Sequence, residues 1–69
     1  MKFLNVYECR RFEQNGNDWM GALLIAARTE EQANSIFAEI EGEPAKDTLL
    51  MDGVYASGDP RVIYDNDPR

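Results

Sequence analysis

The feature that most constrains this chain is a helix signal in residues 28–44, RTEEQANSIFAEIEGEP. Thr29 followed three residues later by Gln32 is a capping box, in which side chains satisfy free backbone N–H groups at a helix start. Gly42 favours the left-handed conformation that ends a helix, and Pro44 cannot continue one. Between these ends, apolar residues recur at the spacing of one helix face: Ala33, Ile36, Phe37 and Ile40. The segment predicts one amphipathic helix of about three turns that must cover a sheet.

Two strand-like segments, 3–12 and 19–28, precede this helix and are rich in aliphatic and aromatic residues. Asn15-Gly16 between them is the strongest short-range signal for a two-residue hairpin turn. Pairing around that turn gives a predicted core face with Phe12 opposite Trp19, Val6 opposite Ile25, and Leu4 opposite Ala27. The other face is also apolar, with Tyr7 opposite Leu24 and Cys9 opposite Ala22, so a bulge or a covering segment could reverse the choice.

The segment after the helix is less strongly patterned. Residues 45–51 predict either a second short helix or the approach to a third strand. The sequence predicts a short C-terminal hairpin, with strands at 54–56 and 61–64 around the turn-rich tetrapeptide 57–60. Residues 65–69 are predicted to form a frayed tail. The expected fold is a single α+β domain over residues 1–69, with a small antiparallel sheet packed against one helix.

Composition excludes several classes of function. A chain of 69 residues has a small core and little room for an enclosed active site, and it contains no histidine. Cys9, the single cysteine, is expected to be a small core residue. Asp65-Asn66-Asp67 lacks the rest of a calcium loop, because Pro68 and Arg69 follow it. We therefore expect no enzyme activity, no metal site and no cofactor.

Charge and hydropathy bear on partners and location. The formal net charge of −6 argues against direct binding to nucleic acid or to anionic lipid, both of which require Lys and Arg to meet phosphate. The apolar run 20–27 is far shorter than the roughly 20 residues that span a bilayer. A single cysteine fits a reducing compartment. We expect a cytoplasmic protein that does not engage membranes and is a monomer.

The acidic residues are unevenly distributed, with 10 of 13 in residues 29–69. The segment EIEGEPAKD places four of them within nine residues: Glu39, Glu41, Glu43 and Asp47. Glu30, Glu31 and Asp52 are expected to support them. These carboxylates could be an ordinary solvated surface. Alternatively, their spacing approximates the phosphate row of DNA, and they would then bind a protein partner with a basic nucleic-acid-binding groove.

The order of elements resembles that of small phage and prophage anti-CRISPR proteins: MKFLNVYE, a polar turn, WMGALLIAA, the capped TEEQANSIF and a short terminal hairpin. The resemblance covers size, acidity and element order. It implies a non-enzymatic inhibitor that occupies the DNA-binding channel of a CRISPR surveillance complex in a bacterial host. The alternative is a phage or bacterial accessory domain that binds another protein through an apolar sheet surface including Tyr55 and Tyr64, with acidity serving solubility.

Overall fold

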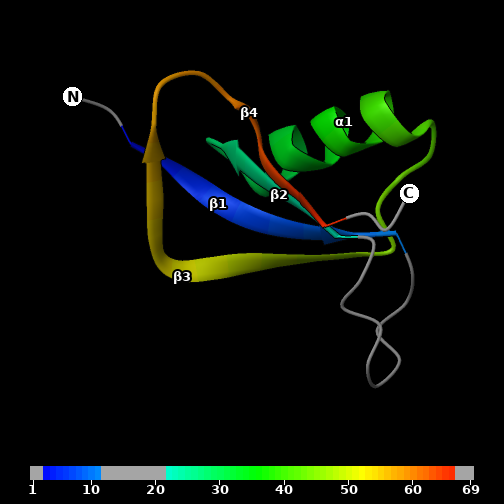
Figure 1. Cartoon of the computed structure of the whole chain (residues 1–69), viewed down its shortest axis with the longest axis horizontal. Coiled ribbons are helices and arrows are strands. Elements are labelled where there is room, and N and C mark those ends of the chain that lie inside the picture. The colour runs from blue at the N-terminus through cyan, green and yellow to red at the C-terminus, as the bar shows by residue number, and fades with distance from the viewer. Residues whose placement is uncertain (1–2, 12–21, 67–69) are drawn as a thin grey trace.

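A four-stranded antiparallel sheet and one helix make up the part of the chain that the computed structural model describes, residues 3–11 and 22–66. The elements are β1 (Phe3–Arg10), β2 (Ala22–Ala27), α1 (Glu30–Glu41), β3 (Asp47–Ser57) and β4 (Arg61–Asn66). The strands are ordered β3-β1-β2-β4, and α1 lies on one side of the sheet, in contact chiefly with β1 and β2 (Figure 1). The predicted α+β class is confirmed.

Both ends of α1 form as the sequence predicts. The Thr29 hydroxyl oxygen accepts a hydrogen bond from the Gln32 N–H at 3.1 Å, and the Gln32 side chain accepts one from the Arg28 N–H at 2.8 Å. Gly42 has a φ of 82° and donates its N–H to the Ala38 carbonyl oxygen at 2.8 Å. These bonds satisfy backbone groups that a bare helix end leaves free, so local sequence is enough to define the helix.

The apolar stripe of α1 is buried over only part of its length. Ala33 and Phe37 are fully buried and Ile36 packs against the core, but Ile40 in the last turn is 51% exposed. The prediction that Ile40 covers the sheet is therefore wrong. Burial of the stripe ends one turn before the helix itself ends.

The register of β1 with β2 differs from the predicted one by one residue. Val6 lies opposite Ala26 rather than Ile25, and Asn5 rather than Leu4 lies opposite Ala27. The predicted pairs of Tyr7 with Leu24 and Cys9 with Ala22 are replaced by Tyr7 with Ile25 and Cys9 with Leu23. An odd number of residues connects Arg10 to its partner Ala22, whereas regular pairing around a two-residue turn requires an even number. The Asn15-Gly16 turn, Phe12 and Trp19 lie outside the described residues.

Both faces of the central strands are buried, and the helix covers the face predicted as the outer one in β1 but the face predicted as the core in β2. Phe37 and Ala33 of α1 form one core cluster with residues of β1 and β2: Tyr7, Cys9, Leu23, Ile25 and Ala27. Leu4 and Val6, the predicted core of β1, are also buried, but on the opposite face. The core-face prediction is therefore wrong for β1 and confirmed for Ile25 and Ala27 of β2, because a register shift of one residue places the other face of β1 beside them.

A sharp bend interrupts β3. Leu50 lies opposite Tyr7 and Tyr55 lies opposite Asn5, so residues 51–54 face the single residue Val6. The additional residues turn the strand through the corner seen in Figure 1, and Gly53 adopts a φ of 78° within it. The structure therefore places a strand, and no second helix, at 47–51.

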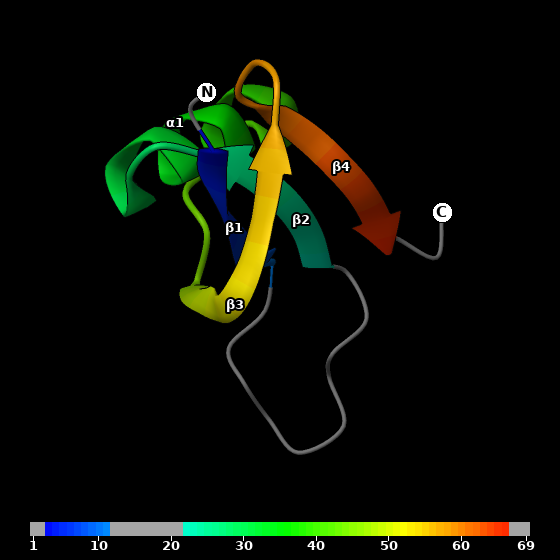
Figure 2. The ribbon, with the colours of Figure 1, turned by 90° about the vertical axis from the view of Figure 1, so that its left-hand side faces the viewer.

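β3 and β4 follow each other in the chain but do not pair, so the predicted C-terminal hairpin does not form. They lie at opposite edges of the sheet, joined by residues 58–60 (Figure 2). A flat sheet would separate its edge strands by roughly 14 Å, about the full reach of an extended chain from Ser57 to Arg61. Gly58 at φ 98° shows that this connection is a turn, so the sheet must curl to bring its edges closer. Leu4 and Val6 are buried on the face of the sheet opposite α1.

β4 also extends further than expected. It includes Asp65 and Asn66, which the sequence analysis places in the frayed tail. Residues 67–69 lie outside the described part of the chain.

Candidate binding surfaces

An ion pair joins the end of β1 to the end of α1 and engages one of the predicted binding residues. The Arg11 guanidinium donates two hydrogen bonds to the Glu41 carboxylate, one from Nε to Oε1 at 2.5 Å and one from Nη2 to Oε2. The two side chains are only 14% and 11% exposed. The hydrogen bonds that Arg11 donates to Glu41 raise the pKa of Arg11, against a smaller opposing effect of burial. Glu41 is therefore part of the fold rather than a carboxylate presented to a partner.

A second arginine engages two carboxylates on the face of the sheet opposite α1. Arg10 lies opposite Asp47 in the register, and their side chains approach to 3.8 Å. The Arg10 guanidinium also donates a hydrogen bond of 3.2 Å to Glu8. The Arg10 side chain is 12% exposed, and its partners Glu8 and Asp47 are 24% and 31% exposed. The pairing with Arg10 compensates the charge of Asp47, a central member of the predicted acidic set.

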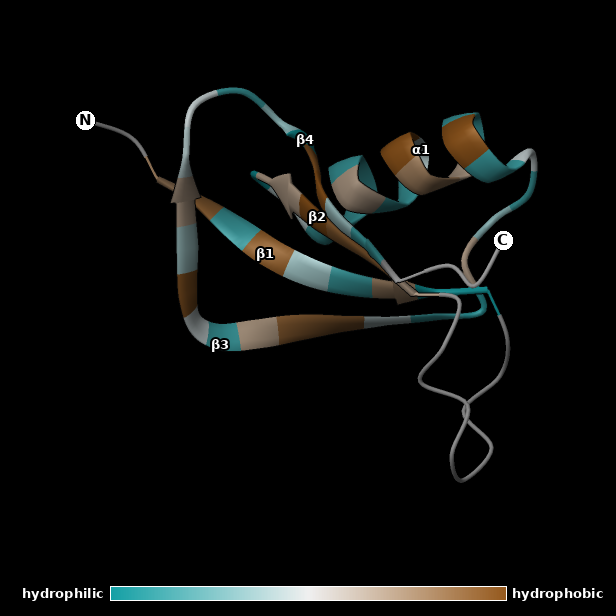
Figure 3. Cartoon of the chain, viewed as in Figure 1, coloured by the Kyte–Doolittle hydropathy of each residue, from teal (hydrophilic) through white to brown (hydrophobic). Residues whose placement is uncertain are grey.

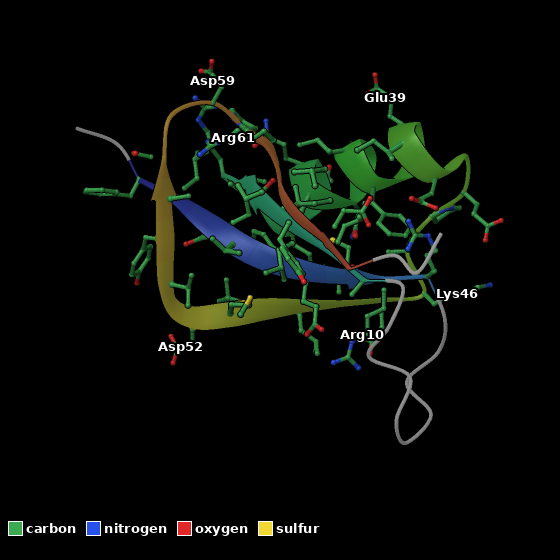
Figure 4. The ribbon with its side chains drawn as sticks, in the orientation of Figure 1. Arg10, Glu39, Lys46, Asp52, Asp59 and Arg61 are labelled. Carbon is green, nitrogen blue, oxygen red and sulfur yellow. The ribbon has the colours of Figure 1, made fainter. Side chains whose placement is uncertain are left out.

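The other five predicted carboxylates are exposed but lie in three separate places. Glu30 and Glu31 occupy the first turn of α1, where the helix dipole favours negative charge. Glu39 lies near the other end of the helix, roughly 14 Å along its axis from Glu30, and Glu43 follows the C-cap. Asp52 lies at the corner of β3, on the opposite side of the molecule from Glu39 (Figure 4). The structure thus leaves Glu39 and Glu43 as a local pair and does not gather the whole set on one face.

Large apolar side chains are exposed mainly on the two edge strands. Figure 3 shows hydrophobic positions continuing along β3, away from α1. Leu49, Leu50, Val54 and Tyr55 lie on β3, Ile63 and Tyr64 on β4, and Phe3 and Ile40 complete the set. Tyr55 is 63% exposed and Tyr64 56%. Edge strands have one unpaired side, so some exposure is expected, but side chains of this size are usually accompanied by a cover.

The register divides these side chains between the two faces of the sheet. Leu50 opposite Tyr7, and Tyr55 opposite Asn5, lie on the face that also carries α1. Tyr64 lies opposite Leu24, whose side chain points to the other face. Because opposed residues in an antiparallel pair share a face, Tyr55 and Tyr64 belong to different surfaces. Both tyrosines are possible binding residues predicted from the sequence, whereas the exposure of Phe3, Leu50 and Val54 was not predicted.

The chemical groups that could support catalysis are few in the described residues. Cys9 is fully buried, and burial raises the pKa of its thiol to about 11, with an opposing hydrogen bond to Thr48. Residues 3–11 and 22–66 contain no cluster of three or more Cys, Asp or Glu side chains placed to hold a metal ion. A shallow hollow on the outer side of α1 is lined by Thr29, Glu31, Gln32 and Ser35. No helix in the described chain combines the length and apolar character needed to cross a membrane.

No family model, curated protein or solved structure matches this chain. Its function must therefore be inferred from its own surfaces. Two are candidates: the exposed apolar side chains of the edge strands, and the local carboxylate pair Glu39 and Glu43.

Proposed function

We propose that the protein acts by binding another protein through the apolar surface of its edge strands, without catalysis and without a cofactor. The observation that carries this proposal is the set of large apolar side chains exposed on β3 and β4. A partner that covered these side chains would gain about 25 cal/mol of binding free energy for each Å² of apolar surface removed from water. Tyrosine is also enriched in protein interfaces, because its ring supplies contact area and its hydroxyl remains hydrogen-bonded.

Two features of the described chain favour binding through the apolar surface over binding through the acidic residues. Glu41 and Asp47 are compensated by Arg11 and Arg10, so half of the central acidic segment is already engaged within the fold. The exposed apolar groups on β3, by contrast, lie on a strand that α1 contacts less than it contacts β1 or β2. The free carboxylates elsewhere then keep the domain soluble while its apolar surface awaits a partner.

Site-specific photocrosslinking tests this proposal directly. A photoreactive phenylalanine analogue is placed at Tyr55 in one variant and at Glu39 in another, and each is expressed in bacteria. We expect position 55 to crosslink one protein reproducibly and position 39 to give only background. Purified partner must then reproduce the crosslink in isolation. A specific crosslink at position 39 alone would refute the proposal and support the second candidate.

The second candidate is an inhibitor that presents carboxylates in place of DNA phosphates. It is favoured by Glu39 and Glu43, which are exposed and have no hydrogen-bonded or ion-paired partner within the described residues. In this version, a monomer in the cytoplasm of a bacterial host binds the basic channel of a CRISPR surveillance complex and excludes DNA. It rests on the resemblance to anti-CRISPR proteins and on the net charge of −6.

DNA binding by a purified surveillance complex, with and without this protein, tests the second candidate. One double variant, Glu39→Gln with Glu43→Gln, removes two negative charges beside the end of α1. A control double variant, Asp52→Asn with Asp59→Asn, removes two negative charges elsewhere. Both change the net charge from −6 to −4. The candidate requires inhibition at low salt that only the first pair weakens and that high salt reduces. Equal loss in both pairs would indicate a general charge effect, and no inhibition by the wild type would eliminate it.

A further inference from the structure

One part of the exposed apolar surface has a defined geometry. Phe3, Leu50 and Tyr55, which we call the Tyr55 surface, share the face of the sheet that carries α1. Phe3 lies opposite Ser57 and Asn5 opposite Tyr55, so Phe3 and Tyr55 are diagonal neighbours on adjacent strands. Diagonal positions are roughly 7 to 8 Å apart, within reach of aromatic side chains. The two rings therefore belong to one continuous patch.

The helix does not extend over this patch. The buried residues of α1, Ala33 and Phe37, pack on Tyr7, Leu23 and Ile25. Figure 1 shows α1 at the end of the sheet away from the upright half of β3, which contains Tyr55, and Figure 2 shows this half of β3 on the side facing away from α1. Phe3 and Tyr55 are each more than 60% exposed.

Acidic residues flank the Tyr55 surface along the chain. Asp52 precedes Tyr55 by three residues in the bent part of β3, and Asp59 follows in the turn. Figure 4 shows Asp52 and Asp59 at the two ends of the upright half of β3.

A nearby arginine offsets this charge only in part. The Arg61 guanidinium points back into the turn and donates hydrogen bonds of 2.8 Å to the carbonyl oxygens of Ser57 and Asp59. Along this half of β3 and the turn after it, the described residues therefore place one cation, Arg61, against the two carboxylates of Asp52 and Asp59 (Figure 4). Their summed charge is negative.

We propose that the Tyr55 surface binds a basic, apolar segment of a partner protein. An aliphatic side chain of that segment packs against the rings of Tyr55 and Phe3, and lysines or arginines on either side of it approach Asp52 and Asp59. Basic side chains are attracted here both by the carboxylates and by the faces of the aromatic rings, which attract cations. A second copy of this chain is disfavoured as the occupant, since each copy carries a net charge of −6.

This inference rests on the proposed protein-binding function and specifies the partner chemistry. Its test uses three synthetic hexapeptides titrated into the isotopically labelled full chain, with amide chemical shifts as the readout. One alternates lysine and leucine, one alternates glutamate and leucine, and one alternates lysine and serine. We expect only the lysine–leucine peptide to shift the amides of residues 3–5 and 50–56 in a saturable way. Shifts from the glutamate–leucine peptide of equal size, or shifts centred on Glu39 and Glu43, would overturn the inference.

Matched variants locate the site. Tyr55→Ser should weaken binding of the lysine–leucine peptide at least tenfold, whereas Tyr64→Ser removes an equally exposed tyrosine from the other face and should leave it unchanged. Asp52→Asn should weaken it about two- to fivefold, with a smaller salt dependence. Equal losses in Tyr55→Ser and Tyr64→Ser would refute the assignment to the Tyr55 surface.

Two further outcomes distinguish binding of a basic segment from protein binding in general. A reproducible crosslink at position 55 together with no peptide binding would retain the protein-binding function and reject the basic partner. Sedimentation that shows a dimer of the wild type, dissociated by Tyr55→Ser, would reject it in favour of a second copy.

Discussion

Replacing Phe37 with alanine tests whether the helix stabilises this fold through a single buried ring. Phe37 is fully buried between α1 and the sheet and belongs to the main core cluster. Truncating a buried phenylalanine costs about 3 to 5 kcal/mol, from lost transfer free energy and from the cavity left behind. A domain of 69 residues is expected to have a free energy of unfolding of about 3.5 to 10 kcal/mol. Phe37→Ala should therefore remove much or all of the stability.

Urea denaturation followed by far-ultraviolet circular dichroism measures this effect. With an m-value of about 1 kcal/mol/M for a small domain, the midpoint should fall by roughly 3 M or more. Phe37→Leu fills most of the same volume and should cost about 1 kcal/mol, which keeps the measurement possible if the alanine variant is unfolded.

Ile40→Ala is the matched control, because Ile40 lies on the same helical stripe but is half exposed. Complete burial of an aliphatic side chain stabilises a protein by about 1.5 to 3 kcal/mol, so half of that, about 1 kcal/mol, is expected here. If Phe37→Ala and Ile40→Ala lowered the free energy of unfolding equally, the arrangement of α1 on the sheet described above would be wrong.

Three further changes address single contacts, each read out as the free energy of unfolding. Thr29→Ala removes the acceptor for the Gln32 N–H and should cost about 1 kcal/mol, while Thr29→Ser should restore it; no loss in the alanine variant would show that the cap contributes nothing. Glu41→Gln leaves Arg11 without its mostly buried partner and should cost about 1 to 3 kcal/mol, whereas Glu39→Gln should stay within about 0.5 kcal/mol. The thiol pKa of Cys9 is raised from 9.0 to about 11, so the unfolded chain loses its proton first and stability should fall as pH rises from 9 to 11. The loss should be roughly 2 kcal/mol and should be absent in Cys9→Ala; the same pH dependence in both proteins would contradict the burial of the thiol.

The contrast between Glu41 and its neighbours changes how the acidic segment should be tested. Glu39, Glu41 and Glu43 look equivalent in the sequence, so replacing all three with glutamine would be the natural test of the acidic segment. Because Glu41 binds Arg11, that triple variant would destabilise the fold as well as remove charge. A loss of partner binding could then reflect unfolding, and the double replacement of Glu39 and Glu43 avoids this ambiguity.

Features determined by neighbours in sequence were predictable, and those determined by distant residues were not. The capping box and Gly42 act within a few residues, and α1 begins and ends where they indicate. The pairing of Arg11 with Glu41 joins residues 30 positions apart, and no local pattern reveals it. The exposure of Tyr55 depends on how far α1 extends over the sheet.

The strand errors have the same origin. A shift of one residue in the register moves every side chain of a strand relative to its partner, so the predicted pairs of β1 and β2 all changed together. For β3 and β4, a turn between two apolar runs predicts a hairpin, yet each strand pairs with a different central strand. A hairpin and this arrangement have the same local sequence requirements, and only the assembled sheet distinguishes them.

The arrangement of the edge strands also determines when the domain can fold. Each edge strand joins the sheet by pairing with a strand formed much earlier in the chain: Phe3 meets Ser57 and Ala26 meets Arg61. Contacts between residues so far apart give a high relative contact order, for which folding in milliseconds to seconds is typical rather than the microseconds of small helical proteins. During synthesis, β1 and β2 have no outer neighbours until β3 and β4 leave the ribosome. Until then their open edges can pair with other chains, so the nascent protein is most prone to aggregation just before its last strands appear.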